Sequence, residues 1–300
     1  CAIHSALFSL SVGAGDRVIV PPFTFIATSN SVIHAGAEPV FADIEEESFN
    51  LDPDKVEEIL KKDKKGKIKA VICVHLFGRP CEMDRFARIS AKYGVKIIED
   101  AAQAHGSEFA GRKAGSFGNA AAFSMYATKN MTMGEGGMVT TNSDKTAELL
   151  RKFINHGSEK VYFHTLIGYN YRTTDIEAAI GLCQLKKLDY FNERRRQNSV
   201  RMRGILRHYD MLVMPSENEK SKHIFHQFTV RVKGGMRDAL IKHLNENGVG
   251  AKVFYPIALH KQPVYRGMFK GVRMPVAEKA AREVMSIPVH PGLTDVDFET

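Results

Sequence analysis

The chain has 300 residues, of which 44% are hydrophobic and 25% are charged, so it can bury a large core in one domain or two. It contains no run of about 18 apolar residues, so we expect no membrane span and a soluble, cytoplasmic protein. The net charge of +8 suits an anionic ligand. No helix-turn-helix spacing, zinc pattern or mixture of aromatic and basic residues accompanies that charge, so we expect neither nucleic-acid binding nor a metal site.

The ends, the cysteines and the basic segments add three smaller expectations. The chain begins at Cys1 without the zones of a signal peptide, so we expect it to be part of a longer sequence. Cys73 and Cys183 lie in apolar patterns, which predicts reduced thiols that pack as small hydrophobic side chains. We interpret the basic segments Lys61–Lys69 and Arg194–Arg203 as solvated helix faces and loops.

Short apolar runs alternate with amphipathic segments over the first 142 residues. Helical patterns are found at 54–60 and 83–93, and the second ends at Gly94, which suits a C-terminal cap. Near-continuous apolar strands joined by helices predict an α/β fold whose mostly parallel sheet is covered by helices on both faces. The expected strands are 18–20, 39–41, 70–74, 96–98, 120–124 and 137–141.

The second half begins with a helix and continues as a smaller α/β unit. Thr174-Asp175-Ile176-Glu177 has the form of a capping box, and we expect its helix to run to about Phe191 with one apolar face. That face comprises Ile176, Ala179, Ile180 and Cys183. We expect a strand at 224–232, a helix at 236–247 closed by Gly248, a strand at 252–255 and a helix at 276–285. With a soft boundary near 195–215, this predicts a large domain (1–200) and a small C-terminal domain (201–300).

Two segments carry candidate chemistry. Lys96 to Gly106 (K-I-I-E-D-A-A-Q-A-H-G) puts Asp100 at the carboxyl end of a buried strand, where open α/β sheets place ligands. Such an acid can equally cap the next helix. Lys129 stands alone in the uncharged segment F-S-M-Y-A-T-K-N, where a lowered amine pKa would suit Schiff-base chemistry. Taken without the neighbouring motif, such a segment more often holds a surface loop lysine.

Weaker signals surround these two residues. Gln103 and Ser124 lie near predicted strand ends, where they can bind a ligand or satisfy the local backbone. Gly134, Gly136 and Gly137 can adopt positive φ and let the backbone approach a ligand, although glycine-rich turns are common.

Ordered motifs along essentially the whole chain resemble the DegT/DnrJ/StrS family of sugar aminotransferases, pyridoxal-phosphate enzymes of fold type I. The motifs are P-P-F-T-F-I-A-T, G-A-E-P-V-F-A-D-I, E-D-A-A-Q-A-H-G, S-M-Y-A-T-K-N, G-E-G-G-M-V, G-Y-N-Y-R at Gly168 and Y-P-I-A-L-H at Tyr255. The resemblance implies that Lys129 forms a Schiff base with pyridoxal 5'-phosphate and then moves a proton as base and acid. It also implies that Asp100 pairs with the protonated pyridine nitrogen.

The resemblance implies further roles for other side chains. Phe25 would stack on the cofactor ring, although such a residue is more often in a core. Gln103 and Ser124 would hydrogen-bond the ring oxygen and the phosphate. Asn170 would reach the phosphate of the other subunit's cofactor, which implies a homodimer with shared active sites. His260 and Arg172 would face the substrate, and a structural histidine or a surface ion pair fits them as well.

The implied reaction moves an amino group from L-glutamate to a nucleotide-diphosphate-linked keto-sugar. Cyclitol transamination, cofactor-dependent dehydration and a non-catalytic regulatory role remain alternatives. The lysine at 129 disfavours dehydration, because the dehydratase branch has a histidine there. The family's phosphate-binding hydroxyl and glycine residues, which precede the position of Cys1, are absent from this sequence.

Overall fold

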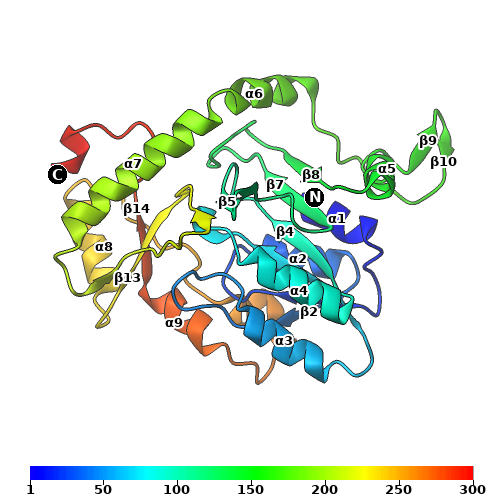
Figure 1. The fold of residues 1–300 in the computed structure, drawn as a ribbon, viewed down its shortest axis with the longest axis horizontal. Coiled ribbons are helices and arrows are strands. Elements are labelled where there is room, and N and C mark those ends of the chain that lie inside the picture. The colour runs from blue at the N-terminus through cyan, green and yellow to red at the C-terminus, as the bar shows by residue number, and fades with distance from the viewer. Residues whose placement is uncertain (300) are drawn as a thin grey trace.

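The computed structural model describes residues 1–299 and is built around a six-stranded sheet (Figure 1). Five of its strands run parallel, and β8 alone is antiparallel, pairing with β7. In spatial order the strands are β2 (Glu38–Phe41), β1 (Arg17–Val20), β3 (Ile68–Val74), β4 (Lys96–Asp100), β7 (Ala120–Ser124) and β8 (Gly137–Thr140). The predicted α/β class and all six predicted strands are confirmed, with ends that differ by at most two residues.

Helices cover both faces of this sheet because its strands alternate buried side chains toward each face. From β3, Ile72 packs with α1 (Ala2–Ser9), α2 (Ala27–His34) and α9 (Pro275–Glu283), whereas Cys73 packs with α3 (Pro53–Lys62) and α4 (Met83–Tyr93). The predicted helix 83–93 is confirmed to the residue. Gly94 ends it at φ 70°, a left-handed conformation that glycine adopts without strain.

The remaining helical and hairpin elements follow the sheet. α5 (Asp144–Phe153) leads to the hairpin β9 (Ser158–Lys160) and β10 (Phe163–His164). The predicted capping box is present, since Thr174 accepts a bond from the Glu177 amide and Glu177 accepts one from the Thr174 amide. The helix it starts, α6 (Asp175–Leu185), ends earlier than expected, and α7 (Leu188–Leu206) continues beyond Phe191.

A smaller antiparallel sheet lies in the last third of the chain. It contains β11 (Leu212–Val213), β13 (Phe228–Val232) and β14 (Val284–Ile287), with α8 (Arg237–Glu246) beside it. Another sheet joins β12 (Ser221–Lys222) to β5 (Glu108–Phe109) and β6 (Arg112–Lys113). Short 3₁₀ turns occupy Leu76–Gly78, Leu259–Lys261, Pro263–Tyr265 and Val296–Phe298.

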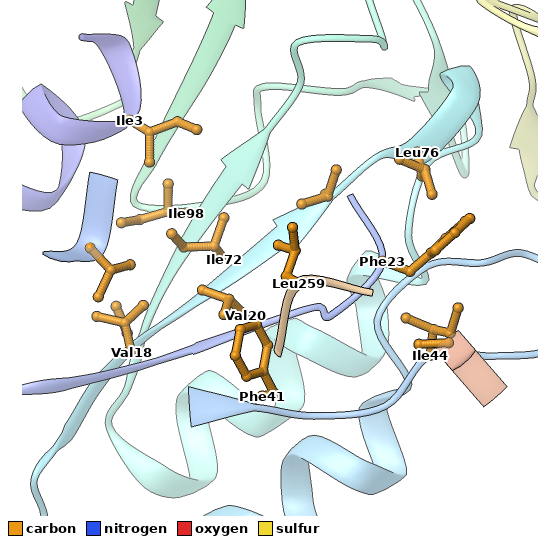
Figure 2. Packing of buried hydrophobic residues seen from close by; sticks show 14 of the residues in the cluster. Ile3, Val18, Val20, Phe23, Phe41, Ile44, Ile72, Leu76, Ile98 and Leu259 are labelled. Carbon is orange, nitrogen blue, oxygen red and sulfur yellow. The ribbon is translucent and has the colours of Figure 1, made fainter. Parts of the chain in front are cut away.

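The C-terminal third also contributes to the core of the large sheet. Leu259 lies among Val20 and Ile72 in Figure 2, and Ala277 and Ala280 of α9 belong to the same buried cluster. Asp43, just after β2, fixes α9 by accepting bonds from the Val276 and Ala277 amides at 2.9 and 3.0 Å. A division into residues 1–200 and 201–300 stays a prediction, and the two parts share this core.

Four expectations about the second half were wrong. Residues 252–255 form no strand, because Tyr255 has φ 61° and only Lys252 bridges to Ser286. The strand expected at 224–232 begins at Phe228, and the helix expected at 276–285 ends at Glu283, where β14 starts. Cys183 is exposed, because nothing within residues 1–299 covers that side of α6.

The basic segment of α7 is also less solvated than expected. Arg195 donates to the carbonyls of Phe225 and His226, and burial lowers the pKa of its guanidinium to about 10. Arg196 donates to the carbonyl of His223 at 2.8 Å. The prediction failed here because α7 packs against residues 223–226. Among residues 1–299, no helix is both long and apolar enough to cross a membrane.

Candidate active site

Asp100 ends β4 at the carboxyl edge of the sheet, with its carboxylate buried. Oδ2 accepts a 2.9 Å bond from the Thr28 hydroxyl, and Oδ1 accepts a 3.2 Å bond from the Ala102 amide. Burial raises the pKa of this carboxyl above its ordinary value, while Thr28, Ala102 and Lys129 act in the opposite direction. Each carboxylate oxygen has a second lone pair, so Asp100 can accept a further hydrogen bond.

Lys129 lies in the loop between β7 and β8, where its side chain is half-buried. Its amine has no hydrogen-bond or ion-pair partner within residues 1–299, although the charge of Asp100 is close enough to affect it. Burial lowers the pKa of the Lys129 amine, and Asp100 opposes that shift. The loop therefore presents an amine that loses its proton more readily than an ordinary lysine does.

This set of donors and acceptors fits pyridoxal phosphate. An amine of lowered pKa suits attack on an aldehyde, and a buried carboxylate with spare acceptor capacity suits a protonated ring nitrogen. Phe25 is 63% exposed in the loop before α2, so it is not the core phenylalanine that remained an alternative. The Phe25 carbonyl accepts a 3.2 Å bond from the Thr28 amide, which ties this aromatic ring to the residue that binds Asp100.

Gln103 is more constrained than a free ligand-binding side chain. Its Oε1 accepts a 2.7 Å bond from the Phe77 amide, and its Nε2 donates a 2.8 Å bond to the Tyr255 hydroxyl. Nε2 carries a second proton, so contact with a ring oxygen remains open to it. Ser124 uses its hydroxyl oxygen only weakly, accepting from the Tyr126 amide at 3.4 Å, so its proton is free to reach a phosphate.

The positive φ expected of the three glycines is found in two of them, and the approach of their backbone to a ligand stays a prediction. Gly134 has φ 85° and Gly136 has φ 137°. Gly137 instead opens β8, and a Cβ there would lie 2.9 Å from the Phe123 carbonyl oxygen. The close approach at Gly137 is therefore to the neighbouring strand.

The remaining predicted residues contact other parts of the chain. Asn170 and Arg172 are exposed on the segment between the β9–β10 hairpin and α6, and Arg172 donates a 2.7 Å bond to Asn155. His260 is buried and its Nε2 lies 3.1 Å from Glu278 of α9. That contact fits the structural histidine that the sequence left open, but His260 Nδ1 has no hydrogen-bond partner among residues 1–299, and a substrate contact of this ring stays a prediction.

Sequence reasoning missed several residues around Lys129. Thr28 was overlooked although it closes the P-P-F-T-F-I-A-T motif, and His105 although it is the histidine of E-D-A-A-Q-A-H-G. Burial lowers the pKa of His105 to about 4, and the Lys129 ammonium acts in the same direction. Asn130 and His226 carried no sequence signal, because their 2.9 Å contact joins segments 96 residues apart.

The mostly parallel sheet covered by helices on both faces is the fold of type I pyridoxal-phosphate enzymes, and Lys129 and Asp100 offer the amine and the carboxylate that such an enzyme would need. Comparison with known proteins narrows this class. The profile of the DegT/DnrJ/EryC1/StrS aminotransferase family matches residues 1–300, and the chain belongs to this family. It is therefore a pyridoxal-phosphate-dependent aminotransferase, as the motifs predicted.

Similar proteins carry both enzymatic and regulatory names. The "pleiotropic regulatory protein" of Geobacillus stearothermophilus is 42% identical over 98% of this chain and 78% of its own length. The GDP-perosamine synthase of Caulobacter vibrioides is 36% identical over 99% of this chain and 80% of its own. The structure of S. venezuelae DesV in complex with a ketimine intermediate superposes with a TM-score of 0.94, at 36% identity, covering 99% of this chain and 79% of that one.

Proposed function

We propose that this chain transfers an amino group from L-glutamate to the keto group of a nucleotide-diphosphate-linked sugar. The Lys129–Asp100 pair carries the proposal, because it supplies the amine and the carboxylate that transamination requires. The names of relatives such as GDP-perosamine synthase support a nucleotide sugar as substrate. The net charge of +8 suits a substrate that carries a diphosphate.

Each side chain of the site has a separate role in the proposed reaction. When bound, pyridoxal phosphate supplies an aldehyde and a protonated ring that stabilises carbanions. Asp100 would pair with the protonated ring nitrogen, and Thr28 and Ala102 keep its carboxylate in place. Lys129 would hold the aldehyde, and its amine would act as base toward the substrate carbon and as acid toward the cofactor, so that the proton passes from the first to the second. Phe25 would lie against the ring, and Gln103 and Ser124 would hold the ring oxygen and the phosphate.

We further propose that the active unit is a homodimer. The β9–β10 hairpin and the segment that follows it expose Val161, Tyr162 and Ile167 by 85%, 94% and 87%, and α6 exposes Ile176 and Leu182 by 77% and 65%. These elements project from the body of the molecule in Figure 1. Such apolar surfaces are typical of subunit interfaces, and a second copy would cover them.

Asn170 supports a shared site because the surrounding structure holds it rigidly at the surface. Its neighbours Tyr169 and Tyr171 stack at 4.8 Å, and both rings contact His4 of α1. The Tyr169 and Tyr171 amides donate to the carbonyls of Phe153 and Ile154 at 2.7 and 3.0 Å. In our proposal Asn170 reaches the phosphate of the partner's cofactor, and Arg172 lies near the substrate there.

The decisive experiment is a panel of nucleotide-linked 3-keto and 4-keto sugars, assayed for glutamate-dependent amination. We expect one keto position and one nucleotide to be strongly preferred. The regulatory name of the Geobacillus relative makes a non-catalytic role the second candidate. A cofactor absorbance band that L-glutamate abolishes supports the enzyme, whereas a band that no amino donor changes supports the regulatory role.

A further inference from the structure

Three buried side chains and one carbonyl form a continuous hydrogen-bonded chain beside Lys129. His226 Nδ1 lies 2.9 Å from Asn130 Oδ1, and Asn130 Nδ2 donates to Asn192 Oδ1 at 2.8 Å. Asn192 Nδ2 then donates to the carbonyl of His105 at 2.7 Å. We call these four residues the amide relay, and all of them are buried.

The direction of every bond in the amide relay is determined. Asn130 Oδ1 can only accept, so Nδ1 of His226 must carry the proton. Burial lowers the pKa of His226 well below its ordinary value, with Lys129 and Arg195 acting in the same direction, so the ring is neutral. Each asparagine uses its oxygen as acceptor and its nitrogen as donor. A buried network in which all three side chains are hydrogen-bonded selects one arrangement of the segments that carry it.

The relay joins four parts of the chain that no single element connects. His226 lies just before the start of β13, Asn130 is the neighbour of Lys129, and Asn192 lies in α7. His105 follows Asp100 by five residues. The contact between α7 and this segment is close, since a Cβ on Gly106 would lie 2.8 Å from Asn192 Nδ2. The relay therefore fixes the Lys129 loop against the segment that carries Asp100.

We propose that Asn130, Asn192 and His226 are positioning residues that hold the Lys129 amine toward Asp100 and keep water from its loop. The proposal deepens the function proposed above and rests on it. The charge of Asp100 in β4 acts on the Lys129 amine, and the charge of Lys129 acts on the imidazoles of His105 and His226. The charge of Arg195 in α7 also acts on His226. Both imidazoles are held neutral by burial, so Asp100 provides the charge that Lys129 faces.

The test compares two buried asparagines of the same helix in the cofactor-free protein. Asn192→Leu breaks the relay, whereas Asn198→Leu removes a matched 2.8 Å bond to the carbonyl of His290, six residues along α7. The pH dependence of Lys129 acetylation by acetic anhydride, followed by mass spectrometry, gives the pKa of its amine. We expect Asn192→Leu to raise that pKa by about one unit, a roughly tenfold loss of reactivity below it. Asn198→Leu should leave it unchanged.

A second pair of variants keeps the test independent of folding defects. His226→Asn retains a donor near the position of Nδ1, and His226→Leu removes it. We expect the asparagine variant to keep the wild-type pKa of Lys129 and the leucine variant to raise it. If the pKa of the Lys129 amine were the same in Asn192→Leu and Asn198→Leu, or in the two His226 variants, the positioning role of the amide relay would be overturned. That outcome would leave the proposed function intact, because amination of a keto-sugar by the wild-type enzyme is measured separately.

Discussion

The hydroxyl of Thr28 donates a 2.9 Å hydrogen bond to Oδ2 of Asp100, although the two residues are 72 positions apart in the chain. Thr28 lies in the first turn of α2 and is almost fully buried, so no water replaces this bond easily. The contact opposes the effect of burial, which raises the pKa of the Asp100 carboxyl. Thr28 thus helps to keep an anion where the reaction needs one.

Removing that hydroxyl should weaken catalysis without removing the cofactor. Thr28→Val keeps the shape of the side chain, leaves Asp100 with one donor fewer and raises the pKa of its carboxyl further. We expect kcat/KM to fall by on the order of tenfold, since a bond to a charged group contributes about 1.5–3 kcal/mol. Steady-state kinetics of Thr28→Ser, which restores a hydroxyl, provide the control. Equal losses in both variants would show that the hydroxyl is not the cause.

Asp100→Asn should leave the cofactor bound but remove the anion that pairs with its ring nitrogen. We expect turnover to fall by on the order of several hundredfold, about 3 kcal/mol or more of transition-state stabilisation. Cofactor occupancy is measured by absorbance in the same samples. Near-wild-type turnover at full occupancy would refute the role of Asp100.

Although Asp100→Asn should lower turnover, we expect it to maintain or raise the stability of the cofactor-free protein. A carboxyl whose folded-state pKa is raised binds more protons folded than unfolded, so its contribution to stability falls as pH rises above about 3.8. The amide introduced by Asp100→Asn would still accept from the Ala102 amide and could donate to the Thr28 hydroxyl, with no buried charge. We therefore expect this variant to unfold in urea at a midpoint equal to or above wild type at pH 7. A clearly lower midpoint would contradict this sign.

Lys129→Ala should abolish the covalent link between protein and cofactor. Lys129 is the only amine in its loop, so the absorbance should become that of free or non-covalently bound pyridoxal phosphate. Borohydride reduction followed by mass spectrometry of the peptides tests for the link. Wild-type turnover together with a reducible link elsewhere would assign the chemistry to another lysine.

The large sheet was predictable because local pattern and tertiary structure agree there. The helix at 83–93 combines an apolar stripe with a terminal Gly94, and both signals lie within a few residues. The local pattern of V-M-S-I at 284–287 does not indicate one structure, because a short apolar run is found both at helix ends and in strands. Its pairing with β13, more than fifty residues earlier, makes it a strand. The expected strand at 252–255 failed because no sequence rule places Tyr255 at positive φ.

The candidate site also contains residues that the sequence suggested and contacts that only the folded chain creates. The positions of Asp100 at a strand end and of Lys129 among uncharged residues could be predicted from sequence, and the family pattern links the two, while their roles in catalysis stay a proposal. Their supporting contacts could not be predicted, since Thr28 and Asn192 act through bonds that only the folded chain creates. The contact between His260 and Glu278 of α9 could not be predicted either, because it joins residues 18 positions apart that only the folded chain brings together.

The shared active site leads to a prediction that depends on which chain supplies Asn170. In the proposed dimer, each site uses Lys129 from one chain and Asn170 from the other. Loss of a hydrogen bond to a charged phosphate costs roughly 1.5–3 kcal/mol, so Asn170→Ala should weaken cofactor binding by about ten- to a hundredfold. A titration with pyridoxal phosphate measures that loss directly. Arg172→Ala, an exposed neighbour that we place near the substrate, is the control and should leave cofactor affinity unchanged.

Mixing two inactive variants then tests whether Asn170 of one chain serves the active site of the other. A mixed dimer of a Lys129→Ala chain and an Asn170→Ala chain has one site with both defects and one site with neither. At limiting cofactor, where both parents are inactive, we expect the mixture to regain activity that approaches half the wild-type value per mixed dimer. If Asn170 served the cofactor of its own chain, both sites of the mixed dimer would be defective. Subunit exchange would then restore nothing, and the shared site would have to be abandoned.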